Sequence, residues 1–186
     1  SGRLPVTWPR DVGQIPIHHA QRPTGRPPHP RDPFTSKYLD LPNEPLFCFG
    51  HGLSFSRVAL RNLHAALTRL DDGLRVEVEV EATNEGRMET EETIFLFIHD
   101  VVASVARPLL ELKDWRKATL GPGERRTIRF SLDQEAFRFL DRSLAPVIEP
   151  GEVEIIVGLS ADADRALRTS IVIPQDAART IGQDQA

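Results

Sequence analysis

The chain has 186 residues, a hydrophobic content of 40% and a formal net charge of −4. This length suits one domain, or one domain with a long appendage. The charges form no basic stripe and no run of Lys or Arg, which argues against a nucleic-acid partner, and the apolar runs are too short to cross a bilayer.

A single cysteine, Cys48, excludes a disulfide framework and a multi-cysteine metal site. Its neighbours Phe47 and Phe49 favour a small, buried apolar side chain over a reactive thiol. One cysteine leaves the compartment open, because a core of this size needs no disulfides even in an exported protein.

The first part of the chain differs in composition from the rest. Residues 1–50 hold ten of the 15 prolines and carry six basic and four acidic residues, so this segment has a charge of +2 and the remainder −6. Proline at this density forbids a long helix or a central strand. A flexible linker would contain few large apolar residues, yet this segment has Trp8, Ile15, Ile17, Phe34, Tyr38, Leu39, Leu41, Leu46, Phe47 and Phe49. We therefore predict an extended arm that buries these side chains on a protein surface.

From residue 74 onward the pattern is that of β-strands. Apolar side chains alternate with Arg75, Glu77, Glu79 and Glu81 over residues 74–82, which predicts a strand with one buried and one solvated face. Residues 93–98 are apolar on both faces, as in a central strand. Further strands are predicted at residues 110–120, 127–132, 153–159 and 167–173, with turns such as that at residues 121–124 between them. Short strands with turn signals between them indicate an all-β sandwich.

Two segments are ambiguous on pattern alone. Leu60, Leu63, Leu67 and Leu70 lie at helical spacing, so residues 57–70 would also make an amphipathic helix. Residues 134–140 follow Asp133, a suitable N-cap, and one helical turn is expected there.

Residues 44–55 read EPLFCFGHGLSF. They resemble the segment that joins the second catalytic domain of family 3 glycoside hydrolases to a C-terminal sandwich. Cys48 stands where that pattern usually has proline, and His51 where it usually has tyrosine. Residues 1–10, 12–16, 22–27, 102–108, 111–113 and 120–124 also resemble the family, in the same order, so the resemblance covers about residues 1–173.

The resemblance implies an Ig-like or fibronectin type III-like antiparallel β-sandwich of about seven strands at residues 54–175, preceded by the extended Pro-rich arm. It implies that residues 1–53 are the end of an α/β-sandwich catalytic domain and the connecting arm. It also favours a strand over a helix at residues 55–63. Residues 176–186 are polar and aperiodic, so we expect a disordered tail.

The family hydrolyses glycosides with retention, which requires a carboxylate nucleophile and a carboxyl acid/base about 5 Å apart. The resemblance places both upstream of this chain, so no catalytic residue is expected here. Glu77, Glu79 and Glu81 are explained by a solvated sheet face. No cofactor or metal is expected either, because His18 and His19 are adjacent on an extended chain and point apart, and His29 lies between prolines.

The expected function is that of a structural C-terminal part of a β-glucosidase-type enzyme, which braces the catalytic domains and is not itself catalytic. The expected partners are those upstream domains and a second copy in a homodimer, with a β-glucoside substrate bound only through the parent. A periplasmic or secreted location is favoured over a cytoplasmic one. Arg26 and Tyr38 are candidates for the rim of the substrate site, with docking of the arm as the alternative. A carbohydrate-binding or protein-interaction module of Ig-like fold is the competing interpretation.

Overall fold

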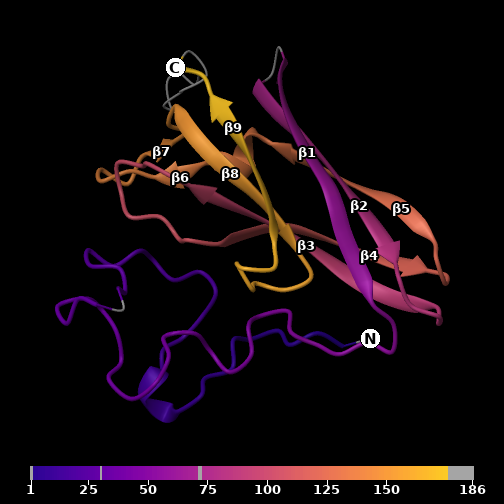
Figure 1. Ribbon diagram of the computed structural model, residues 1–186. Helices are drawn as coiled ribbons and strands as arrows, with labels where there is room; N and C mark the ends of the chain where they lie inside the picture. The colour runs from indigo at the N-terminus through magenta and orange to yellow at the C-terminus, as the bar shows by residue number, and fades with distance from the viewer. Residues whose placement is uncertain (1, 30, 71–72, 176–186) are drawn as a thin grey trace.

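The computed structural model describes residues 2–29, 31–70 and 73–175, which form a two-layer β-sandwich with an extended arm along one side (Figure 1). The strands of the first sheet are β1 (Val58–Leu70), β2 (Gly73–Asn84) and β5 (Arg125–Asp133), in the order β1-β2-β5. The second sheet has the order β4-β3-β8-β9 and contains β3 (Thr90–Asp100), β4 (Glu111–Leu120), β8 (Gly151–Gly158) and β9 (Leu167–Ile173). All pairs are antiparallel.

The core lies between the two sheets and follows the alternation in the sequence. On β2 the inward side chains Leu74, Val76, Val78, Val80 and Ala82 are all at most 5% exposed. Full burial of one valine side chain is worth about 1.5–3 kcal/mol. The predicted antiparallel β-sandwich is therefore confirmed.

Strand β3 is buried on both faces, as its sequence predicts. Ile94, Leu96 and Ile98 point into the main core. Phe95 and Phe97 point to the outer side of the same sheet, where they form a second cluster with partners that include Phe49 of the arm. The arm therefore covers a hydrophobic sheet face that would otherwise meet water.

The leucines at helical spacing lie on a strand. β1 is paired with β2, and two residues of β1, Asn62 and Leu63, stand opposite Val80 in a β-bulge. The extra residue brings Leu63 to the core face that Leu60 already occupies, although the two are separated by an odd number of positions. Asn62 has a positive φ of 54°. The predicted strand is confirmed, with bounds of Val58–Leu70 instead of 55–63.

The described residues contain nine strands, not about seven. Seven of them make the two main sheets, and the other two, β6 (Phe139–Leu140) and β7 (Pro146–Val147), form a small hairpin. The helical turn expected after Asp133 is a 3₁₀ helix, Gln134–Phe137, capped by the Asp133 carboxylate, which accepts a hydrogen bond from the Glu135 N–H. A second 3₁₀ helix, Val12–Gln14, lies in the arm.

Asn84 connects the end of β2 to three other segments from a fully buried position. Its Nδ2 donates to the carbonyl oxygens of Met88 (2.7 Å) and Leu120 (3.0 Å), and its Oδ1 accepts from Ser56 Oγ (2.6 Å) and the Gly86 N–H (2.9 Å). Buried polar groups left without a partner cost about 1–3 kcal/mol each.

We expect Asn84→Leu to lower the free energy of unfolding by about 3 kcal/mol, because it keeps the volume and removes all four hydrogen bonds. Urea denaturation measures the change. Thr119→Ala, at an exposed position on β4, is the control and should change the free energy of unfolding by less than about 0.5 kcal/mol. Equal effects of the two substitutions would contradict this role of Asn84.

Candidate functional site

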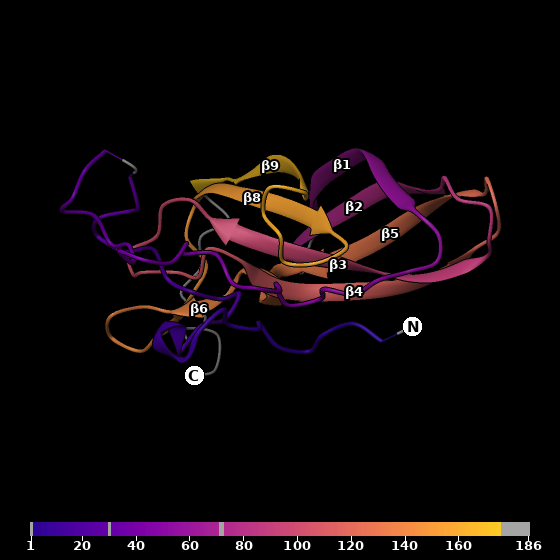
Figure 2. The same ribbon diagram turned by 60° about the horizontal axis from the view of Figure 1, so that its bottom comes forward.

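The two ends of the arm run side by side along the outer side of the β4-β3-β8-β9 sheet (Figure 2). The Leu4 N–H donates to the His51 carbonyl (2.9 Å), and the Gly50 N–H donates to the Leu4 carbonyl (2.8 Å). Further along, Trp8 and Phe47 form an isolated antiparallel bridge. The start of the arm is thus held by backbone hydrogen bonds to its returning segment, residues 46–53.

Aromatic rings fix this returning segment to the sandwich. The Phe49 ring lies edge-on to that of Phe95, with centroids 5.4 Å apart, and 4.5 Å from the His19 ring. The Ala161 N–H donates to the Phe49 carbonyl (2.8 Å). Gly50 has a φ of 80°, and a Cβ on it would meet the Phe95 ring at 2.8 Å, so the chain can pass here only as glycine.

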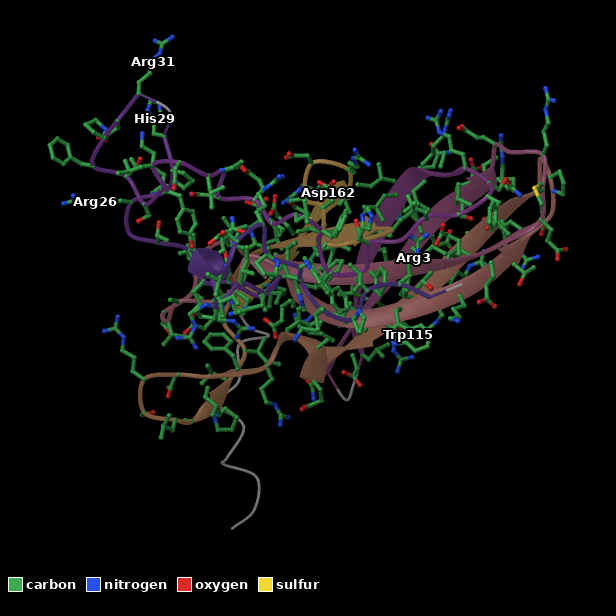
Figure 3. The ribbon with its side chains drawn as sticks, turned by 90° about the horizontal axis from the view of Figure 1, so that it is seen from below. Arg3, Arg26, His29, Arg31, Trp115 and Asp162 are labelled. Carbon is green, nitrogen blue, oxygen red and sulfur yellow. The ribbon has the colours of Figure 1, made fainter. Side chains whose placement is uncertain are left out.

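An ion pair between distant parts of the sequence anchors the first residues of the arm. Arg3 pairs through Nη2 with Oε1 of Glu92, and its Nη1 donates to the Gly52 carbonyl (2.9 Å). The Arg3 side chain is 12% exposed and that of Glu92 is 3% exposed. Both line a hollow of about 580 Å³ whose other lining residues include Ser54, Arg57 and Asp162. Arg3 and Asp162 are labelled in Figure 3. Sequence reasoning missed this pair, because no local pattern links positions so far apart.

Much of the apolar surface of the arm, and of Phe55 directly after it, is left uncovered by the residues that the structure describes. Phe55 is 96% exposed and Leu53 is 88% exposed. The other large apolar side chains of the arm that are exposed are Val6, Trp8, Val12, Ile15, Phe34, Tyr38, Leu39, Leu46 and Phe47. An exposed apolar surface of this extent is typical of an interaction site.

The outer face of the β1-β2-β5 sheet is charged, in contrast to the apolar arm. Glu79 pairs with Arg129 (2.7 Å), Glu81 pairs with Arg125 (3.4 Å), and Glu77 accepts a hydrogen bond from Ser131 (2.6 Å). The three glutamates thus lie on the solvated sheet face that the alternation predicts. Their contacts explain them as surface charges.

Arg26 and Tyr38, the candidates for a substrate rim, both lie on the loop of residues 22–43. Arg26 Nη1 donates to the Phe34 carbonyl (3.4 Å), and the Tyr38 N–H donates to Asn43 Oδ1 (3.1 Å). Tyr38 lines a hollow of about 300 Å³ together with Ile17, Gln21, Ser36, Lys37 and Asn43. Arg26, His29 and Arg31 lie where this loop projects away from the sandwich (Figure 3).

The remaining chemically active side chains of the arm are engaged in packing or exposed. Cys48 is half-buried, and burial raises the pKa of its thiol, with a further rise from Asp162. His18 is exposed, whereas His19 is half-buried against Phe49. In the described ranges, no three His, Cys, Asp or Glu side chains are placed to hold a metal ion. No helix among the described residues is long and apolar enough to span a membrane.

Comparison with known proteins adds the family context. The model of the fibronectin type III-like domain matches residues 92–161. A periplasmic β-glucosidase of Salmonella typhimurium is 38% identical over 163 residues, which cover 87% of this chain and 21% of that protein. A β-xylosidase of Formosa agariphila is 33% identical, with 92% of this chain and 23% of that protein covered.

Solved structures agree with these sequence matches. The crystal structure of a β-glucosidase from Listeria innocua superposes with a TM-score of 0.84 at 36% identity, and the match covers 92% of this chain and 24% of that one. The chain therefore spans about a fifth of the length of the curated relatives it matches.

The Arg3–Glu92 pair yields a prediction about the arm. Arg3→Met leaves a buried carboxylate without its cation, so we expect the free energy of unfolding to fall by about 3 kcal/mol. The double substitution Arg3→Met with Glu92→Met should recover most of that loss, because two apolar side chains can replace a buried pair at little cost. Urea denaturation of the three proteins measures both effects.

The matched control is Arg57→Met, which breaks the exposed contact between Arg57 and Glu85 (3.3 Å). It should cost at most about 1 kcal/mol. If Arg3→Met cost no more than this control, the buried pair would not be what anchors the arm.

Proposed function

Because this chain belongs to the glycoside hydrolase family 3 proteins, as their β-glucosidase-like C-terminal segment with a fibronectin type III-like domain, we propose that it braces the catalytic domains of a longer enzyme. The observation that carries this proposal is the apolar surface of the arm. Ten large apolar side chains of the arm, from Val6 to Leu53, are exposed, as is Phe55 directly after it, while the outer face of the β1-β2-β5 sheet carries ion pairs. One side of the molecule is suited to a protein surface and the other to water.

The proposed partner of this surface is the upstream part of the same polypeptide. The matched relatives are about five times as long as the matched segment. At about 25 cal/mol per Å² of buried apolar surface, covering the arm would stabilise the assembly by several kcal/mol. In this arrangement residues 1–53 continue the α/β-sandwich catalytic domain and residues 54–175 form the fibronectin type III-like domain. The proposed tail, residues 176–186, lies outside the described residues.

The activity proposed for the whole enzyme is hydrolysis of terminal β-D-glucosyl residues with retention of configuration. Its two carboxyl groups would come from the upstream domains, and this chain would contribute none. The relatives named above are β-glucosidases and a β-xylosidase, so the sugar is set elsewhere in the protein. One of them is named as periplasmic, which supports a periplasmic or secreted location.

A carbohydrate-binding or protein-interaction module is the second candidate, and Trp115 is the observation in its favour. This side chain is 52% exposed on β4 and is labelled in Figure 3. A sugar platform usually needs more than one exposed ring, and from Val58 to Ile173 the described residues offer Trp115 alone as an exposed aromatic side chain. We therefore favour the bracing function.

Leu53 and Phe55 provide the direct test of docking. In the 186-residue chain both side chains are almost fully exposed, so Leu53→Asp and Phe55→Asp should change its stability by less than about 0.5 kcal/mol each. In the full-length enzyme the same substitutions would place a charge in a buried interface, and we expect the melting temperature to fall by several degrees. Differential scanning calorimetry of both proteins provides the comparison.

Met88→Asp is the control, because Met88 is 57% exposed and lies in the β2–β3 turn, outside the arm. It should leave both melting temperatures unchanged. A full-length enzyme that tolerated Leu53→Asp and Phe55→Asp as well as Met88→Asp would refute the docking of the arm.

Arg26 and Tyr38 extend the proposal to the substrate. We propose that their loop contributes to an outer sugar subsite or to a contact within a homodimer, which its projection away from the sandwich supports. Arg26→Ala and Tyr38→Phe in the full-length enzyme should then raise KM for di- and trisaccharides several-fold and leave KM for an aryl β-glucoside nearly unchanged. Steady-state kinetics on the two substrate classes separates the effects. Unchanged KM values for the oligosaccharides would rule out the subsite.

A further inference from the structure

His19 lies where the arm meets the sandwich. Its ring centroid is 4.5 Å from that of Phe49, on the returning segment, and 5.9 Å from that of Phe97, on β3. Two residues later the Gln21 carbonyl accepts a hydrogen bond from the Leu109 N–H (2.8 Å). One imidazole therefore contacts both the arm and the sheet, next to a backbone hydrogen bond that joins the arm to the loop after β3.

Two effects compete over the charge of this imidazole. A protonated ring packed against phenylalanine gains a cation–π attraction, whereas burial penalises the charged form. Burial wins: it lowers the pKa of His19, and the charge of the adjacent His18 lowers it further. The packed position of the ring therefore favours the neutral imidazole over the charged one.

We propose that the packing of His19 against Phe49 and Phe97 holds the arm on the sandwich in a pH-sensitive way. The contact is stable while the imidazole is neutral and weakens when the imidazole takes up a proton. The proposal concerns contacts within this chain, so it does not depend on the function proposed for the whole enzyme.

The direction of the effect follows from linkage. A histidine that is free in solution has a pKa of 6.5, and docking lowers the pKa of His19 below that value. Above pH 6.5 His19 is neutral in both the docked and the released arm, so the free energy of docking has its most favourable value. As the pH falls below 6.5, the released arm binds the proton first, so docking weakens progressively down to the lowered pKa.

The titratable and charged groups around this contact come from several elements. On the arm they are His18 and the Cys48 thiol, and the loop between β8 and β9 adds Asp162, Asp164 and Arg165 close to Cys48. On β3 they are His99, whose Nδ1 lies 2.9 Å from Glu154 Oε2, and Asp100, whose pKa is raised by burial. His99 is a second imidazole, on β3 itself, so the test must separate its contribution from that of His19.

Hydrogen exchange of backbone amides in the 186-residue chain provides the test. The Leu109 amide, bound to the Gln21 carbonyl, and the Ala161 amide, bound to the Phe49 carbonyl, report on docking of the arm. After correction for intrinsic rates, we expect exchange at both sites to be several-fold faster at pH 5.5 than at pH 7.5. The amide of Val78, in the core of β2, should show no such change.

Three variants identify the group responsible. His19→Phe keeps an aromatic ring that cannot be protonated, and should abolish the pH dependence at Leu109 and Ala161. His19→Tyr tests the same point should phenylalanine disturb the fold. His99→Gln should leave the pH dependence intact. A pH dependence that survived both His19 variants, or that disappeared with His99→Gln, would overturn the proposal, as would an NMR titration of His19 at pH 6.5 or above.

Discussion

The burial of β3 on both faces is the constraint around which the molecule is arranged. A strand with Ile94, Leu96 and Ile98 on one face and Phe95 and Phe97 on the other cannot leave either face to water without losing several kcal/mol. The first face is covered by the opposite sheet. The second is covered by Phe49 and the rings around it, so the path of the arm follows from the composition of one strand in the sandwich.

Most strands of the sandwich could be predicted from the sequence, because the alternation of apolar and polar residues is a local signal. The nine-residue pattern on β2 and the apolar run of β3 needed no knowledge of the fold. The leucines of β1 show where local reasoning fails: a three-residue spacing fits a helix turn and a bulged strand equally well, and only the resemblance to a family separated them. The Arg3–Glu92 pair lay beyond prediction, since its partners meet only after the arm has folded back. The roles of Arg26 and Tyr38 depend on atoms outside this chain.

The edge strands of the sandwich carry charges that disfavour pairing with a strand of another chain. β4 and β5 are the outer strands at one side of the two sheets, and both carry basic residues that pair with acidic neighbours, such as Lys117 with Glu91 (3.1 Å) and Arg129 with Glu79 (2.7 Å). Charges on an exposed edge discourage a second chain from adding a strand there. The two most exposed large apolar side chains, Leu39 and Phe55, lie on the arm and directly after it, where contact with another protein surface is useful.

The bulge at Asn62 also bears on how β1 can change during evolution. Side chains alternate between the two faces of a strand. The bulge takes up the one additional residue and therefore keeps Leu63, and every second residue after it, on the core face of β1. A chain that lost the Asn62 codon would place Leu63 alone opposite Val80, so β1 would pair with β2 without a bulge and Leu63, Ala65 and Leu67 would still point inward. This exposed position is therefore expected to vary among descendants in length as well as in residue type, because the same side chains reach the core with or without the extra residue.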